Sequence, residues 1–171
     1  MAFVTISIRL DLMTRNSFLQ IILCFVLTVA APLSHAAPDF GDGSSSTLAT
    51  KAWKALEAGN WADVVAYCNQ CITSFEKEAL ITEAKLKETP APAGESDEAI
   101  AMRWALNDVG TCYFILGQAL QKQGKDDEAK KAFNKVIESL PNAQCWDTQG
   151  WYWKPADAAK EQLYDLELKA K

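Results

Sequence analysis

The chain has 171 residues, with 17 lysines and arginines against 22 aspartates and glutamates, and a formal net charge of −5 at pH 7. Hydrophobic residues make up 49% of it, which is typical of a domain with an apolar core. Because an acidic chain repels phosphate groups, nucleic acids and anionic membrane surfaces are excluded as principal partners.

Residues 1–36 have the pattern of a cleavable secretory signal. Two arginines precede an apolar run at 18–31, which is too short to span a membrane comfortably. Small residues at Ser34 and Ala36 predict cleavage after Ala36. We therefore expect an exported protein, periplasmic or secreted, with anchoring by an uncleaved signal as the alternative.

The only histidine, His35, lies within this leader. Cleavage would remove the residue type that most often acts as a general base or a metal ligand, so we expect no catalytic residues, no metal and no cofactor. Residues 37–47 are small and polar and predict a flexible lead-in. The remainder, 48–171, is expected to form one helical domain.

The segment 110–143 carries the clearest helical pattern. A first apolar stripe ends at Gly124, and a second helix opens with acidic residues that suit its positive end and stops at Pro141. We expect Gly117 to face Ala129, a contact between small residues that sets the angle of the hairpin. The two stripes are formed by Tyr113, Leu116, Gly117 and Leu120, and by Ala129, Phe133, Val136 and Ile137.

These residues fall where a tetratricopeptide repeat of about 34 residues places its packing positions, and the segment resembles such a repeat. A weaker copy lies at 45–78, where Gly59 aligns with Gly124. Ala52, Val64, Cys68 and Cys71 then occupy packing positions. The resemblance implies an all-α fold of antiparallel helical hairpins that bind another macromolecule.

The inserted residues 79–109 continue the apolar patterns of the helices on either side. They predict a lengthened antiparallel hairpin that projects beyond the repeats, with a turn rich in proline and glycine and a new helix after Ser96. The extension either adds core or presents its tip as a docking element.

Residues 145–169 are expected to cap the second repeat. The segment begins with an aromatic run, and Pro155 suits the first position of a helix. An apolar stripe on that helix can cover the exposed side of the last repeat. The aromatic run contains Trp146, Trp151 and Trp153. These tryptophans either pack beneath the capping helix or bind carbohydrate or peptide.

Beyond the leader the chain has four cysteines. Because the second helix of one repeat packs against the first helix of the next, the resemblance favours a disulfide between Cys71 and Cys112, with Cys145 paired with Cys68 or free. Cys68 and Cys71 also match the spacing of thiol oxidoreductases. Their positions inside a predicted helix, away from its N-terminus and from any strand, favour a structural role.

In tetratricopeptide repeats the concave groove is lined by the first helix of each repeat. The large aromatic residues Trp53 and Phe114 are the expected anchors for a partner. Lysine and asparagine, which hold a terminal carboxylate in some family members, do not occur at Ala49 and Trp53. The groove positions implied by the resemblance are Ala49, Trp53, Leu56, Thr111, Phe114, Gln118 and Gln121.

The sequence thus predicts an all-α domain of two repeats, a lengthened central hairpin and a C-terminal capping helix. Its expected function is non-catalytic binding of a protein or peptide, as an adaptor or assembly subunit of the cell envelope. Two alternatives remain open. One is a thiol-disulfide redox protein using Cys68 and Cys71. The other is a structural subunit that forms homo-oligomers, because two repeats fall short of the roughly three usually needed for stability.

Overall fold

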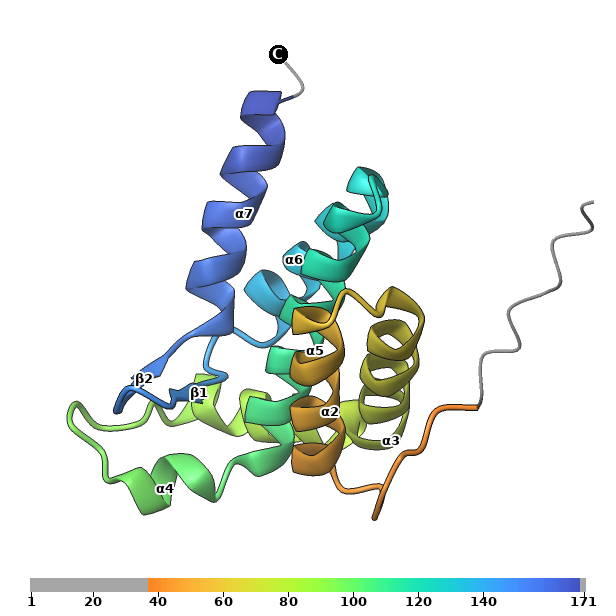
Figure 1. Cartoon of the computed structure of the whole chain (residues 1–171). Helices are drawn as coiled ribbons and strands as arrows, with labels where there is room; N and C mark the ends of the chain where they lie inside the picture. The colour runs from red at the N-terminus through yellow and green to blue at the C-terminus, as the bar shows by residue number, and fades with distance from the viewer. Residues whose placement is uncertain (1–36, 170–171) are drawn as a thin grey trace, which may run out of the picture. The chain divides into compact units, whose positions relative to one another are not determined.

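The structure is a computed structural model and describes residues 37–169, so the predicted signal at 1–36 lies outside the described residues. The unit that begins at Pro38 is built mainly of helices (Figure 1). No helix in this part of the chain is long and apolar enough to cross a membrane. The elements are α2 (Ser45–Glu57), α3 (Trp61–Glu88), α4 (Asp97–Ala101), α5 (Trp104–Lys122), α6 (Asp126–Ser139), β1 (Cys145–Asp147), β2 (Trp151–Trp153) and α7 (Pro155–Lys169).

Two antiparallel hairpins, α2–α3 and α5–α6, confirm the predicted all-α repeat fold. Gly59 and Gly124 form their turns with φ angles of 70° and 72°, a left-handed conformation that favours glycine. α2 and α5 pack side by side (Figure 1), with Ser45 beside Asp108 at one end of the pair.

Gly117 allows close packing in the second hairpin, and its nearest neighbour across the hairpin is Phe133. A Cβ atom added at Gly117 would lie 2.4 Å from Cε1 of Phe133, whose side chain is fully buried. Ala129 is also fully buried. The ring of Phe133, rather than a second small residue, therefore limits how closely α6 approaches α5.

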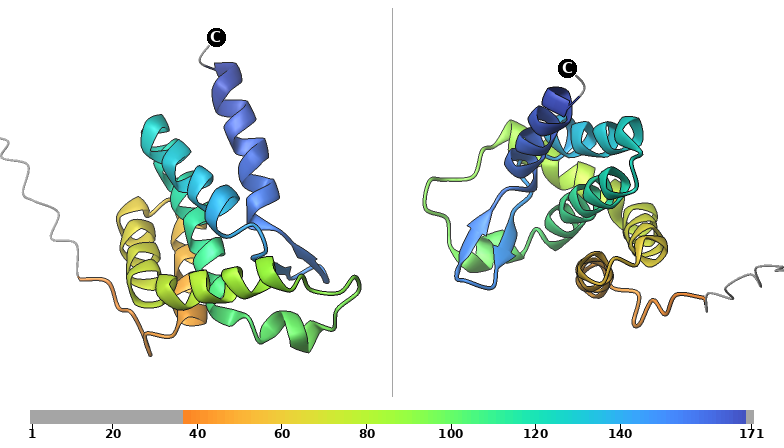
Figure 2. Two further views of the ribbon diagram at one scale, coloured as in Figure 1. Left: turned by 180° about the vertical axis from the view of Figure 1, so that it is seen from behind. Right: turned by 45° about the horizontal axis from the view of Figure 1, so that its top comes forward.

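The base of the lengthened hairpin packs against the repeats. Figure 2 shows the second half of α3 turning away from the direction of its first half and crossing the end of α5 that carries Trp104. Ala79 is fully buried there, and Glu83 is 1% exposed. The Glu83 carboxylate accepts hydrogen bonds from the backbone N and Nδ2 of Asn142, at 3.2 and 2.8 Å. The base of the extension therefore adds core, which is one of the two alternatives for this segment, whereas residues 87–94 are exposed.

The segment after the turn begins where the sequence predicts. Ser96 is the N-cap of α4, and its hydroxyl accepts a hydrogen bond from the backbone N of Ala99 at 3.3 Å. α4 ends at Ala101, however, and α5 starts only at Trp104. The single long helix expected over 97–109 is therefore interrupted.

Side chains around this interruption hold the chain in place. Arg103 donates two hydrogen bonds of 2.6 Å to the Glu95 carboxylate. Nδ2 of Asn107 donates to the carbonyl of Ile100 at 2.8 Å, while Oδ1 accepts from the backbone N of Gln144 at 3.0 Å. These bonds satisfy polar groups that a helix break leaves unpaired, and they tie the inserted segment to the start of β1.

The lead-in expected to be flexible packs against the first repeat from Phe40 onward. The Phe40 ring meets Tyr67 edge-on, with centroids 5.9 Å apart, and Asp39 pairs with Lys51 at 3.0 Å. α2 itself already begins at Ser45. The helical domain therefore includes most of this segment.

The C-terminal cap contains a feature that the sequence prediction missed. Residues 145–153 form an antiparallel hairpin of two short strands, in which Cys145 pairs with Trp153. Pro155 then begins α7, as predicted. The apolar stripe of α7 faces α6 and α5. It consists of Ala156, Ala159 and Leu166, which are buried, and Leu163, which is partly buried.

Candidate functional site

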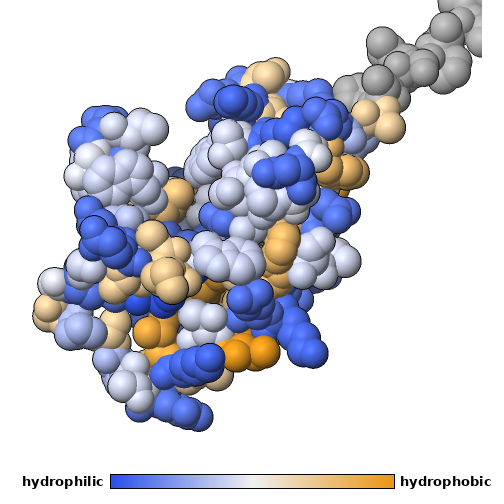
Figure 3. Space-filling model, turned by 90° about the horizontal axis from the view of Figure 1, so that it is seen from below, coloured by the Kyte–Doolittle hydropathy of each residue, from blue (hydrophilic) through white to orange (hydrophobic). Residues whose placement is uncertain are grey.

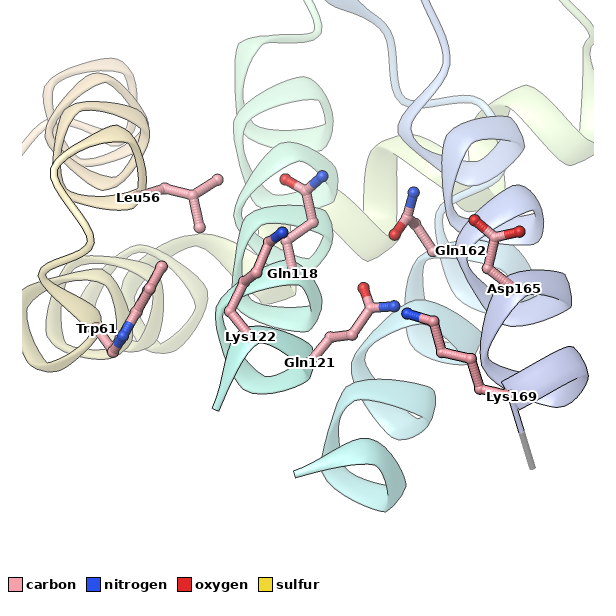
Figure 4. Close-up of a pocket in the computed structure, with 8 residues that line it drawn as sticks. All are labelled: Leu56, Trp61, Gln118, Gln121, Lys122, Gln162, Asp165 and Lys169. Atoms are coloured by element: carbon pink, nitrogen blue, oxygen red, sulfur yellow. The ribbon is translucent and has the colours of Figure 1, made fainter. Parts of the chain in front are cut away.

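A groove with a volume of about 410 Å³ lies between α2, α5 and α7, next to the start of α3 (Figure 4). α5 lies between α2 and α7, so the groove combines the first helix of each repeat with the capping helix. We call this the α2–α5–α7 groove. It is lined by Leu56, Trp61, Gln118, Gln121, Lys122, Gln162, Asp165 and Lys169.

Side-chain amides dominate the space between α5 and α7. Oε1 of Gln118 is sealed from solvent and has no hydrogen-bond partner among the described residues. Such an atom is costly to bury, and because solvent does not reach it, a ligand in the groove does not reach it either. Figure 4 shows Gln118 and Gln162 on the facing helices, both lining the groove. The groove therefore offers amide groups that can pair with the N–H and C=O groups of a peptide backbone.

The charged residues of the groove make it slightly basic. Lys122 and Lys169 contribute two ammonium groups and Asp165 one carboxylate, on a chain whose overall charge is −5. Figure 4 shows the ends of Gln121 and Lys169 pointing toward each other. Neither lysine forms an ion pair within residues 37–169. Both ammonium groups are therefore available to an acidic ligand.

The structure places three of the seven predicted groove residues in this groove: Leu56, Gln118 and Gln121. Ala49 and Thr111 are 6% and 3% exposed and belong to the interior. Thr111 donates its hydroxyl to the carbonyl of Asn107 at 2.8 Å. Neither residue can contact a partner in this conformation.

The two expected anchors belong to an aromatic cluster at the base of the repeats. Phe114 is 5% exposed and packs against Phe133, at 6.0 Å between centroids. Trp153 of β2 covers both anchors, at 6.3 Å from Trp53 and 5.4 Å from Phe114. The missed β-hairpin thus occupies the aromatic surface that the sequence assigns to a partner. Of the three C-terminal tryptophans, Trp153 packs inward, while Trp146 and Trp151 are each 50% exposed.

Sequence reasoning also missed the contribution of α7. Gln162, Asp165 and Lys169 follow one another at spacings of three and four residues, which places them on one face of a helix. The repeat resemblance covers the two helical hairpins and not α7, so it could not indicate this wall. The sequence signal that could have indicated this wall is the helical spacing of these three polar residues on α7, apart from its apolar stripe.

The thiols of Cys68, Cys71 and Cys112 meet between α3 and α5, and all three are fully buried. Contact with Cys112, together with burial, raises the pKa of the Cys71 thiol. Contact with Cys68 and burial raise the pKa of Cys112. A neutral, buried thiol is a poor nucleophile, so this arrangement does not favour thiol-disulfide exchange with an external substrate.

Cys145 lies apart in β1, with its Sγ 3.8 Å from the carbonyl of Trp146. All four of these cysteines are free thiols in the structure. Over residues 37–169, no three cysteine, histidine, aspartate or glutamate side chains are arranged to hold a metal ion.

A comparison with protein-family models matches residues 110–143 to the tetratricopeptide repeat. Comparisons with curated proteins and with solved structures gave no match. The matched residues comprise most of α5, all of α6 and the loop that follows. This repeat generally mediates contacts between proteins and is non-catalytic. Residues 110–143 of the chain therefore form a tetratricopeptide repeat.

Proposed function

We propose that the protein is a non-catalytic adaptor whose α2–α5–α7 groove binds an extended segment of another protein. The observation that carries this proposal is the set of side-chain amides that line the groove, with Gln118 and Gln121 on α5 and Gln162 on the facing α7. An amide can both donate and accept hydrogen bonds, so these side chains can pair with the backbone N–H and C=O groups of an extended peptide.

The charges of the groove indicate which kind of partner segment it binds. With two unpaired lysines and one aspartate, the groove attracts a segment that carries a carboxylate. Because Lys122 and Lys169 stand on different helices, an acidic side chain between them contacts both α5 and α7. The partner proposed here is therefore an extended segment with at least one aspartate or glutamate.

A displayed library of random linear peptides, selected on the full chain, tests this function. Selected peptides are expected to be acidic and to bind Gln118→Leu and Lys122→Glu about tenfold or more weakly, which is the size of one lost charge-assisted hydrogen bond. Lys131→Glu is the matched control, since Lys131 is exposed on α6 outside the groove. Peptides that bind all three variants equally would place the binding site elsewhere.

We further propose that this adaptor acts outside the cytoplasm. The support is the leader at 1–36, with its apolar run and small residues before Ala37. Fractionation of cells that express the full chain, with sequencing of its N-terminus, tests the proposal. A mature protein that begins at Ala37 in the envelope or medium supports it, and a cytoplasmic protein that keeps residues 1–36 contradicts it.

A further inference from the structure

A second cavity, of about 300 Å³, lies at the other end of the α2–α5 pair. Leu56 and Gln118 mark the end that carries the α2–α5–α7 groove, whereas this cavity adjoins the first turn of α2. Figure 3 views the molecule from below, where apolar residues lie among hydrophilic ones. We call the cavity the Asp108 pocket. Its lining residues are Ser44, Ser45, Ser46, Phe75, Trp104 and Asp108.

Among the described residues, Asp108 is the only charged one that lines this pocket. Its Oδ2 accepts a hydrogen bond from the Ser45 hydroxyl, a neutral partner. Across residues 37–169, no lysine, arginine or histidine pairs with this carboxylate. Burial raises its pKa, as expected for an acid without a cationic neighbour.

The N-terminal end of α2 adjoins Asp108 through Ser45, but it does not neutralise the carboxylate. The dipole of a helix is equivalent to about half an elementary charge at that end. The remainder of the carboxylate charge is uncompensated. A partly buried carboxylate in this state is stabilised by any cation that reaches it.

Two aromatic rings form the apolar side of the pocket. Phe75 of α3 meets Trp104 of α5 edge-on, with centroids 5.6 Å apart. Trp104 is 43% exposed, so its indole is open to a ligand. Aromatic faces attract ammonium groups and also pack against methylene chains. A carboxylate beside such rings is suited to a ligand with an apolar stem and a positive end.

We propose that the Asp108 pocket binds an alkylammonium group, with the ammonium on Asp108 and the alkyl stem against Phe75 and Trp104. The Asp108 carboxylate repels an anionic ligand. A neutral alcohol can bind but leaves the charge of Asp108 unpaired. The ligand group is either a lysine side chain of a polypeptide or a free alkylamine. This inference does not depend on the proposed function of the groove.

Titration of the full chain with n-butylammonium, followed by the NMR signals of Ser45, Trp104 and Asp108, tests the pocket. We expect shifts that saturate with n-butylammonium. With n-butanol and with butyrate we expect binding at least about tenfold weaker, because one charge-assisted hydrogen bond is lost. Equal shifts with n-butanol, or no shifts with n-butylammonium, would overturn the proposal.

Two variants separate the pocket from general effects. Asp108→Asn keeps an acceptor for Ser45 but removes the charge, and should weaken n-butylammonium binding about tenfold or more. Asp127→Asn, at an exposed position of α6 outside both cavities, is the matched control and should leave this binding unchanged. Equal weakening by both variants, or unchanged binding to Asp108→Asn, would contradict the assignment.

A further titration distinguishes the two sources of the ammonium group. Nα-acetyl-lysine N-methylamide presents the same stem attached to a peptide backbone. If it binds at least as tightly as n-butylammonium, the pocket accepts lysine side chains of polypeptides. If n-butylammonium binds and the lysine derivative does not, the ligand is a free amine. Either result supports the pocket. If neither compound binds, the proposal is contradicted.

Discussion

Gly117 of α5 lies directly against the ring of Phe133 of α6, so closely that a Cβ atom at position 117 would sit 2.4 Å from Cε1 of the ring. Phe133 also contacts Phe114, and Phe114 packs against Trp153 of the β-hairpin. One glycine thus determines how the second hairpin closes and where the cap rests.

Gly117→Ala should therefore destabilise the domain by about 1–3 kcal/mol through overpacking. Denaturant unfolding measures this loss. Phe133→Leu provides the control, because a smaller residue gives the added methyl group room. In that background Gly117→Ala should cost less than in the wild type, and equal costs would show that the two residues are not coupled.

Glu83 tests whether the extended part of α3 belongs to the core. Glu83→Ala leaves the backbone N and Nδ2 of Asn142 without their acceptor, so we expect a loss of about 1–3 kcal/mol in unfolding free energy. Glu78 is exposed on the same helix, and Glu78→Ala should change stability by no more than about 0.5 kcal/mol. Equal effects would mean that the extension is not anchored.

The thiol cluster predicts a specific bridge in an oxidising compartment. We expect Cys71 and Cys112 to form a disulfide when the protein is unfolded and refolded with oxidised glutathione, because their thiols are accessible before the core closes. The glutathione accepts the two electrons and is reduced to two thiols. Closing the chain between these residues should add about 4 kcal/mol on the loop-entropy model. Peptide mapping without reduction identifies the bridge. A Cys68–Cys112 bridge, or thiols that stay free, would contradict the expected pairing.

Asp108 predicts a characteristic pH dependence of stability. Burial raises the pKa of Asp108 above the ordinary value of an aspartate, so the folded state binds its proton more tightly than the unfolded state. As the pH rises from about 4, the ordinary pKa, through the raised pKa of the folded state, the fold therefore loses stability. Wild type should lose stability relative to Asp108→Asn over that range, measured by thermal unfolding without ligand. A constant difference between the two proteins would show that Asp108 is not responsible.

The repeat positions could be predicted from sequence because they depend on local spacing. Gly59 and Gly124 end their helices, and Val64, Cys68, Cys71, Phe133 and Val136 are all fully buried. The partner of Gly117 could not be predicted, because spacing shows which residues face inward but not which atoms meet. Ala129 and Phe133 lie on the same face of α6, and only the packing decides between them.

The features that sequence reasoning missed depend on contacts between distant residues or on very short elements. The strands of the β-hairpin have three residues each, too few for an alternating pattern to be recognised. The return of α3 to the core depends on Glu83 and Asn142, which are 59 positions apart. The Asp108 pocket likewise brings together three helices. Trp153 covers the expected anchors Trp53 and Phe114, and this contact between distant residues could not be predicted either.

Site-specific photo-crosslinking in cells tests the central claim, that the α2–α5–α7 groove is the binding site, most directly. p-Benzoylphenylalanine is placed at Gln121 in the groove and, in a matched protein, at Lys131 on α6. The account predicts a discrete adduct with an acidic segment of another protein from position 121, which is lost in Lys122→Glu, and no such adduct from position 131. The same adduct from both positions, or from 131 alone, would contradict it.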